Sequence, residues 1–325
     1  MISGDLQKNW LSLESKKMTN QYDLHLLSES SHPDLFIART PDGHRALVLS
    51  LTSLEHLEFK DIEGENLALL KDTHNNFIVI KLINAHFRDL FDYLVTSIGN
   101  AISNVSKSEV YANTFLRSFS QWMQFFVILP EKKLKQNIVQ GIFGELVVLE
   151  ILLKEQAMPE IDNILRAWDG PFDRGSDFIL ENKNIEVKTR VEGNYSVKIA
   201  SENQLDQADG KNLELAVVRL DSKNAAGFTL SQLIEKIVLI CEKKLGDVAI
   251  LFEALQQKNL VPSNFADYDE YIFHPSDITF FDCGSDGFPK LTRSSLPDVI
   301  NNVNYSINTN GINDFEIRKA HYDIS

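Results

Sequence analysis

The segment Ile185-Glu186-Val187-Lys188 constrains the fold of this 325-residue chain more than any other short stretch. Side chains alternate across a β-strand, so Glu186 and Lys188 face one side while Ile185 and Val187 face the other. The apolar side must pack on a core. The pattern therefore predicts a half-buried strand that presents a carboxylate and an ammonium group side by side on its second face.

A second acid, Asp177, stands nine positions before Glu186, at the head of the apolar run 178–180. The polar segment 181–184 between the two runs is typical of a turn. A β-hairpin over these residues would bring Asp177 beside Glu186. Two acids and a lysine at one edge of a sheet suit a divalent metal ion and a phosphodiester.

Phosphodiester hydrolysis needs an activated water molecule and neutralisation of the charge that grows on the phosphate. Mg²⁺ prefers hard oxygen ligands, so Asp177, Glu186 and the backbone carbonyl of Val187 are candidate metal ligands. Lys188 could orient or deprotonate the attacking water, or neutralise the phosphate, and the pattern does not choose between these roles. The alternative is a half-exposed strand with a cross-strand salt bridge.

Glu145 lies in a strongly apolar helical stretch, and its neighbours on the helical wheel are apolar. A carboxylate on such a face is costly unless it is paired or bound to a metal. Gly141 and Gly144 lower helix propensity, but they would let another backbone approach closely, as where a helix packs on a catalytic sheet. The alternative is a helix that is apolar all round, and Glu150 in the same stretch shows that the signal is not unique.

Composition sets broad limits on the chain. It is 43% hydrophobic and 24% charged, as in ordinary globular proteins, and its length predicts two domains, with one large domain as the alternative. The first residues lack a secretory pattern, and no apolar run is long enough to span a bilayer. We expect a cytoplasmic protein that does not enter the membrane, in which Cys241 and Cys283 are reduced core residues.

The formal net charge of -14 argues against a simple DNA-binding surface, because such proteins usually carry a basic footprint. Either a local basic patch forms in three dimensions, or a partner supplies much of the affinity for nucleic acid. Arg190 shares the face of Glu186 and Lys188 and could contact a backbone phosphate. Its alternative role is a salt bridge to Glu192 or Asp177.

The order of patterns predicts a β-rich N-terminal domain over residues 1–100 and an α/β domain over 101–325. In the first part, the turn Pro41-Asp42-Gly43 joins two short strands. The predicted strands there are 35–38, 45–49, 57–59 and 77–82. Helices are expected at 86–105, across the boundary, and at 113–127. In the second part a further helix is expected at 133–155, followed by an irregular stretch at 166–176. We interpret Trp168 in that stretch as a core or loop anchor, and Asp169 and Asp173 as candidates for a second metal ligand.

The rest of the second part alternates strands and helices. Strands are expected at 177–180, 184–190, 196–201, 213–221, 271–273, 278–281 and 303–307, and helices at 230–244 and 248–257. A helix, a hairpin, two further strands and a helix describe an α/β core with a mixed sheet flanked by helices.

Five motifs follow one another in an order that is specific as a set. They are Gly-Ile-Phe-Gly-Glu-Leu (141–146), Trp-Asp-Gly-Pro (168–171), Ser-Asp-Phe (176–178), Ile-Glu-Val-Lys-Thr (185–189) and Ile-Ala-Ser-Glu-Asn-Gln-Leu (199–205). This order resembles the bacterial family of PD-(D/E)XK motif proteins, and the similarity continues to about Tyr305. The resemblance implies a restriction-endonuclease-like fold. Members of the family tend to occur in restriction and phage-defence gene clusters.

The resemblance also assigns roles to residues. The family's helix glutamate falls on Glu145, its first-strand aspartate on Asp177, its glutamate and lysine on Glu186 and Lys188, and its downstream glutamine on Gln204. The proline that often precedes the aspartate is replaced by Ser176, a mild departure. Gln204 is thus a candidate contact to the phosphate or to a metal-bound water, with a helix-start or surface role as the alternative.

Taken together, these residues predict a Mg²⁺-dependent DNA endonuclease, with Mn²⁺ able to substitute, in a restriction or phage-defence system. Expected partners are DNA and other subunits of a defence complex, with a homodimer as one assembly. The rival hypothesis is a catalytically silent structural or regulatory subunit that keeps the fold, which the acidic balance and the β-rich N-terminal part favour. The family match implies the fold more strongly than cleavage, because related proteins have lost catalysis.

Overall fold

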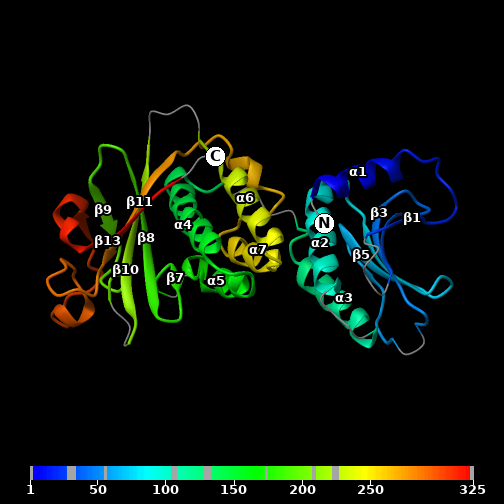
Figure 1. The fold of residues 1–325 in the computed structure, drawn as a ribbon, viewed down its shortest axis with the longest axis horizontal. Coiled ribbons are helices and arrows are strands. Elements are labelled where there is room, and N and C mark those ends of the chain that lie inside the picture. The colour runs from blue at the N-terminus through cyan, green and yellow to red at the C-terminus, as the bar shows by residue number, and fades with distance from the viewer. Residues whose placement is uncertain are drawn as a thin grey trace. The chain divides into compact units, whose positions relative to one another are not determined.

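The chain folds into two compact units, Met1–Leu129 and Pro130–Ser325, each with its own sheet (Figure 1). The computed structural model describes residues 3–27, 34–54, 57–103, 108–127, 133–172, 175–206, 210–221 and 227–322. The boundary between the units lies later than the one predicted after residue 100. Helices α2 (Arg88–Ser103) and α3 (Ser108–Met123) belong to the first unit, because their apolar sides are buried there.

The first unit is built on a six-stranded antiparallel sheet with the order β1-β2-β3-β6-β5-β4. Its strands are β1 (Asp23–Leu26), β2 (Leu35–Arg39), β3 (Arg45–Ser50), β4 (Ile62–Glu63), β5 (Leu67–Asp72) and β6 (Phe77–Leu82). The predicted turn joins β2 to β3, with Gly43 in the left-handed region at φ +87°. The predicted strand at 57–59 is wrong: these residues have no regular structure, because three alternating residues find no ladder partner.

Helices α1 (Ser3–Glu14), α2 and α3 lie on one side of this sheet (Figure 1). The buried residues of α2 recur at intervals of four, as an amphipathic helix requires: Leu90, Leu94, Ile98 and Ile102. The predicted helices at 86–105 and 113–127 correspond to α2 and α3. A cluster of small residues, Ala38, Ala46, Val48 and Val79, is covered by partly buried side chains that include Tyr22, Phe36 and Phe77.

The second unit contains a mixed five-stranded sheet with the order β13-β11-β10-β8-β7. Its strands are β7 (Phe178–Ile179), β8 (Lys183–Val191), β10 (Asn212–Leu220), β11 (Pro275–Asp282) and β13 (Glu316–His321). The central strands β8 and β10 are parallel, and the other neighbours are antiparallel. The prediction of an α/β core with a mixed sheet is confirmed. The predicted strand at 271–273 is reduced to a single bridge between Phe228 and Phe273.

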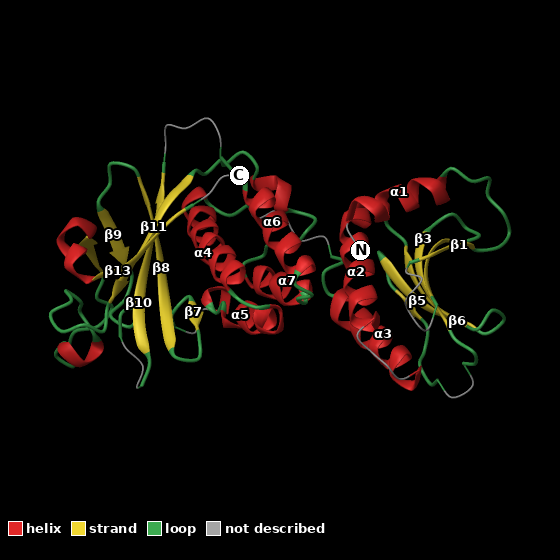
Figure 2. Cartoon of the chain, in the orientation of Figure 1, coloured by secondary structure: helices red, strands yellow, loops and turns green. Residues whose placement is uncertain are grey.

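Helices cover one side of the mixed sheet and a small sheet covers the other (Figures 1 and 2). The helices are α4 (Gln136–Glu155), α5 (Ile161–Ala167), α6 (Leu230–Lys243) and α7 (Val248–Gln257), with the short 3-10 turn η3 (Gly170–Phe172) after α5. The small sheet pairs β9 (Ser196–Ile199) with β12 (Tyr305–Asn308). The 3-10 segment η6 (Thr309–Phe315) follows β12.

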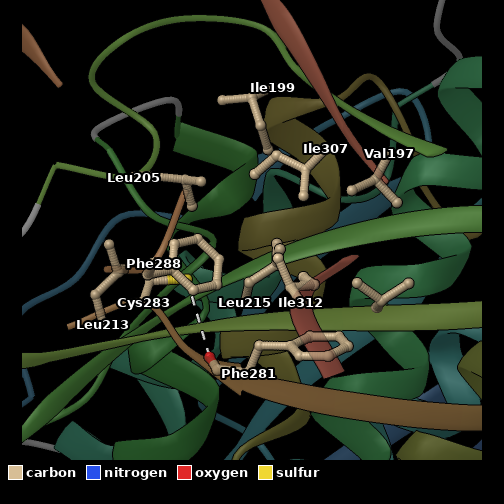
Figure 3. Close-up of a cluster of buried hydrophobic side chains, with 11 residues drawn as sticks. Val197, Ile199, Leu205, Leu213, Leu215, Phe281, Cys283, Phe288, Ile307 and Ile312 are labelled. Carbon is tan, nitrogen blue, oxygen red and sulfur yellow. Dashed lines mark hydrogen bonds between the residues drawn. The ribbon is translucent and has the colours of Figure 1, made fainter. Parts of the chain in front are cut away.

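Between β10 and the β9–β12 pair lies an apolar core whose members include Val197, Ile199, Leu215, Phe281 and Ile307 (Figure 3). Leu213, Leu215 and Val217 of β10 supply its floor, since they point to the same face of the strand. Cys283 also belongs to this core and is reduced, as is Cys241. Burial raises the pKa of both thiols to about 12, so both stay protonated.

Helix α4 packs against β8, β10 and α6 and is the central helix of the second unit. Among the described residues it is the one helix long and apolar enough to cross a membrane, but 61% of that stretch is buried inside the fold. Such burial is expected of a core helix. The predicted close approach occurs at Gly144, where an added Cβ would overlap Cγ2 of Thr189 on β8, but not at Gly141, where an added Cβ meets open space.

Gly144→Ala should therefore destabilise the protein, whereas Gly141→Ala should not. Overpacking a tight contact typically costs about 1–3 kcal/mol, which exceeds the helix-propensity gain of about 1 kcal/mol for replacing glycine with alanine. Gly141→Ala gains the propensity without the overlap. Urea unfolding monitored by circular dichroism should give a lower midpoint for the first variant and an unchanged or higher one for the second. Equal midpoints in the two variants would contradict the proposed helix–strand contact.

Candidate active site

The β7–β8 hairpin brings Asp177 across from Glu186. Phe178 pairs with Ile185 and Ile179 with Asn184, so the next position along the ladder sets Asp177 against Glu186. The backbone N–H of Val187 donates to Asp177 Oδ2 at 2.7 Å, which fixes the carboxylate at the edge of β8. The predicted hairpin thus has the predicted register.

The backbone of Asp177 also holds the loop that precedes η3. Its carbonyl accepts hydrogen bonds from the N–H groups of Asp169 at 2.8 Å and Gly170 at 2.9 Å. An isolated β-bridge joins Trp168 to Phe178. The Trp-Asp-Gly-Pro stretch is consequently pinned against the start of β7, close to the predicted acids.

Glu145 reaches this same point from α4. Its Oε2 accepts a hydrogen bond of 2.8 Å from the indole Nε1 of Trp168. Gly170 lies between two carboxylates, because a Cβ added there would be 2.5 Å from Glu145 Oε2 and 2.9 Å from Asp177 Oδ1. Glu145 and Asp177 therefore border the same small space, which only a residue without a side chain leaves open.

Glu186 and Lys188 form an ion pair on one face of β8, with 2.6 Å between Lys188 Nζ and Glu186 Oε1. Glu186 is only 1% exposed, and its second oxygen, Oε2, is buried without a hydrogen-bond partner. A carboxylate oxygen in this position is costly unless a ligand satisfies it. The alternation predicted for this strand is confirmed, but the strand is not half-buried there: its second face is covered at Glu186 as well.

The acids perturb one another electrostatically. Burial, and then the negative charge of Asp177, raise the pKa of Glu186 well above its usual range, although Lys188 lowers it. Burial and Asp177 likewise raise the pKa of Glu145, against the hydrogen bond from Trp168. The negative charge of Asp177 thus acts on both glutamates. A cation bound between them would reduce the repulsion among all three carboxylates.

The carboxylates of this site fit a divalent metal ion with few protein ligands. Within the described part of the chain, no group of three or more His, Cys, Asp or Glu side chains is arranged to hold a metal ion. Mg²⁺, however, is commonly held by one or two carboxylates and several waters. The free oxygen of Glu186, the adjacent Asp177 and the open space at Gly170 fit that smaller set. The carbonyl of Val187 stays a prediction as a further ligand.

Gln204 is used locally in the structure. Its Oε1 accepts a 2.7 Å hydrogen bond from the backbone N–H of Ala200 and so closes the turn after β9. The predicted contact to a phosphate stays a prediction. Asp169 is buried, and its backbone N–H donates a hydrogen bond to the carbonyl of Asp177. Asp173 lies outside the described residues.

Arg190 shares the face of Glu186 and Lys188, as predicted, but it makes neither of the predicted salt bridges. Its Nη1 donates to the carbonyl of Asn194 at 3.1 Å, and its guanidinium lies 5.4 Å from the ring centre of Tyr195. The acids Glu192 and Asp177 do not engage it. Among the described residues, no carboxylate forms a salt bridge with Arg190; the charge of Asp277 acts on it from a longer distance.

Two residues of the site escaped sequence reasoning. Trp168 was expected to be an anchor; it is buried as expected, and it also holds the catalytic candidate Glu145 through its indole N–H. Gly170 was noted only as part of the Trp-Asp-Gly-Pro motif and was given no role. That motif, which stands shortly before the hairpin, was the available signal.

A comparison with protein families shows to which family this chain belongs. A family model described as "Putative PD-(D/E)XK family member, (DUF4420)" matches residues 6–310. The chain belongs to this family. No match was found among curated proteins or among solved structures. The PD-(D/E)XK match spans both units, and the α/β architecture of the second unit agrees with a nuclease-like fold.

Proposed function

We propose that this PD-(D/E)XK protein is a metal-dependent endonuclease that hydrolyses phosphodiester bonds of DNA. The observation that carries the proposal is the position of Asp177, which borders Glu145 on one side and lies across the hairpin from the Glu186–Lys188 pair on the other. These are the positions on which the resemblance of the sequence motifs places the catalytic acids and lysine of the family.

Asp177 and Glu186 are the proposed ligands of Mg²⁺, for which Mn²⁺ could substitute. The bound ion would supply charge neutralisation at the phosphate and a lower pKa for an attacking water. Lys188, held beside Glu186, brings a positive charge to the same face of β8 and can orient the water or pair with the phosphate. Trp168 keeps Glu145 in position through its hydrogen bond.

The proposed setting is the cytoplasm of a bacterium, within a restriction or phage-defence system. DNA and other subunits of a defence complex are the proposed partners, and a homodimer would supply two active sites for cutting both strands. The β-rich first unit is the candidate for partner binding. Its deletion should abolish co-purification with such subunits, and co-purification that survives deletion would contradict this assignment.

A catalytically silent subunit is the alternative function. The net charge of -14 favours it, as does the β-rich N-terminal part. Such a protein would bind nucleic acid or partners without hydrolysis. The two functions differ in one measurable respect, which is cleavage with all partners present.

Cleavage of plasmid and phage DNA with Mg²⁺ or Mn²⁺ tests the proposal, with wild type compared to Asp177→Ala and Lys188→Ala. We expect nicked or linear products from wild type and a loss of at least about 100-fold in each variant, the scale of removing one electrostatic contact at a reacting centre. Unchanged cleavage by both variants would remove these residues from catalysis. Binding without hydrolysis in the full complex would instead favour the silent subunit.

A further inference from the structure

A small polar cavity of about 170 Å³ lies on the face of the mixed sheet that carries Glu186 and Lys188. The strand register links the cavity to the candidate active site. Lys188 is paired with Val217, Val217 with Thr279, and Thr279 with Lys319, so these residues form one row across four strands. Paired residues in a sheet share a face. Arg190 and Arg219 begin the next row.

The cavity walls are rich in cations and hydrogen-bond donors. Arg190, Arg219 and Lys319 line it, together with the amides of Asn310 and Asn313 from η6. Two acids are also present, Asp277 and the exposed Glu316. This part of the mixed sheet is therefore neither apolar nor predominantly acidic, in contrast to the chain as a whole.

Asp277 is already neutralised by its neighbours. Its carboxylate lies 2.9 Å from Arg219 Nη2, 2.6 Å from His321 Nδ1 and 4.0 Å from Lys319 Nζ. Arg219 is thereby held rigidly, and it also donates from Nε to Ser276 at 2.8 Å. Asp277, the acid that would most directly repel an incoming anion, is consequently already paired with basic side chains.

Arg190 has a hydrogen-bond donor that no described group of the protein accepts from. Its Nε is buried without a hydrogen-bond partner, and its one hydrogen bond goes to a carbonyl group, which carries no formal charge. Burial, and then the charge of Arg219, lower the pKa of Arg190, although the charge of Asp277 acts in the opposite direction. An unsatisfied N–H of this kind costs free energy that an anion would recover.

We propose that this cavity binds a non-scissile phosphate of the nucleic-acid strand, with the Arg190 guanidinium as its main ligand. The inference rests on the proposed function and names the substrate contact next to that site. A strand rises about 3.3 Å per residue, so Arg190 lies roughly 6.6 Å along β8 from Lys188. Phosphates of one strand follow each other at about 3.4 Å along a duplex axis, so this distance corresponds to about two phosphate steps. Guanidinium groups bind phosphates through two parallel hydrogen bonds.

The test is binding of a fluorescently labelled DNA duplex to the full chain in EDTA, followed by anisotropy at several salt concentrations. We expect Arg190→Gln to weaken binding by about 5- to 10-fold and to reduce the slope of log K against log salt by about 0.9, the value for one lost phosphate contact. Arg190→Lys should recover the slope, because it keeps the charge. Lys243→Gln, which removes an exposed cation from α6, is the matched control and should leave both quantities unchanged.

Unchanged affinity and slope in Arg190→Gln would overturn the inference, even if Asp177→Ala abolishes cleavage and the nuclease proposal stands. Absence of duplex binding by wild type would overturn it as well. Reduced binding in Arg190→Gln, with no cleavage by any form of the protein, would keep the phosphate site and remove the nuclease. A variant that loses affinity for inorganic phosphate but not for DNA would assign the cavity to free phosphate and reject the strand contact.

Discussion

Asp177→Asn is expected to abolish DNA cleavage while it stabilises the metal-free protein at neutral pH. Asparagine has nearly the same shape as aspartate, and its amide oxygen can still accept the hydrogen bond from the Val187 N–H. What the variant lacks is the negative charge that proposed metal binding requires. Cleavage should fall by at least about 100-fold, on the scale of losing one electrostatic contact at a reacting centre.

The gain in stability follows from the two glutamates. In the folded protein the pKa values of Glu145 and Glu186 lie above their ordinary values, with burial as the first cause and the charge of Asp177 as the second. For groups with a raised folded-state pKa, stability is greatest below the unfolded pKa and falls as pH rises through the folded one. Without the charge at Asp177 this fall should be smaller. We expect a gain on the order of 1–2 kcal/mol above pH 7, the equivalent of about one pKa unit.

Thermal unfolding with and without Mg²⁺ measures both effects. A ligand that binds only the folded state raises the melting temperature, so wild type should melt higher with Mg²⁺ and Asp177→Asn should not respond. Glu181→Gln removes one exposed acid from the hairpin turn and should respond like wild type. A melting temperature of wild type that Mg²⁺ leaves unchanged would count against metal binding. An Asp177→Asn variant less stable than wild type in EDTA would contradict the proposed repulsion.

The β7–β8 hairpin could be predicted because its determinants are local. Alternation fixed the faces of β8, and the polar turn fixed the register that sets Asp177 against Glu186. Trp168 and Gly170 could not be assigned in the same way. They approach the acids through a β-bridge to Phe178 and through backbone bonds to Asp177, and neither contact leaves a periodic trace in the sequence.

Other differences have equally simple causes. Periodicity identified α2 and α3 but not the unit that buries them, so the boundary predicted after residue 100 fell within the last turn of α2 and separated it from α3. Strand β13 was not predicted because it is a sheet edge whose side chains are mostly exposed, which removes the alternation of buried and polar residues. Local patterns thus revealed the proposed acids and the lysine, whereas the groups that surround them required the structure.

Gly170→Ala is expected to reduce cleavage by about 100-fold without unfolding the protein, since a displacement of about 1 Å at a reacting centre can have this effect. Gly170 does not have a positive φ, so alanine is compatible with the backbone. The new Cβ would instead enter the space between Glu145 Oε2 and Asp177 Oδ1. At least one of the two carboxylates must move. The expected loss of cleavage therefore comes from the displaced carboxylate and not from unfolding.

The matched control is Gly311→Ala, because an added Cβ there meets no atom within 4 Å and the residue is none of those placed at the candidate active site or in the phosphate cavity. Cleavage rates and melting temperatures should be measured for both variants. We expect Gly170→Ala to keep a melting temperature near that of wild type in EDTA but to lose most of its increase with Mg²⁺, because the displaced carboxylate no longer meets the ion correctly. Gly311→Ala should match wild type in both respects. Wild-type cleavage by Gly170→Ala would mean that the space between Glu145 and Asp177 is not where the reaction takes place.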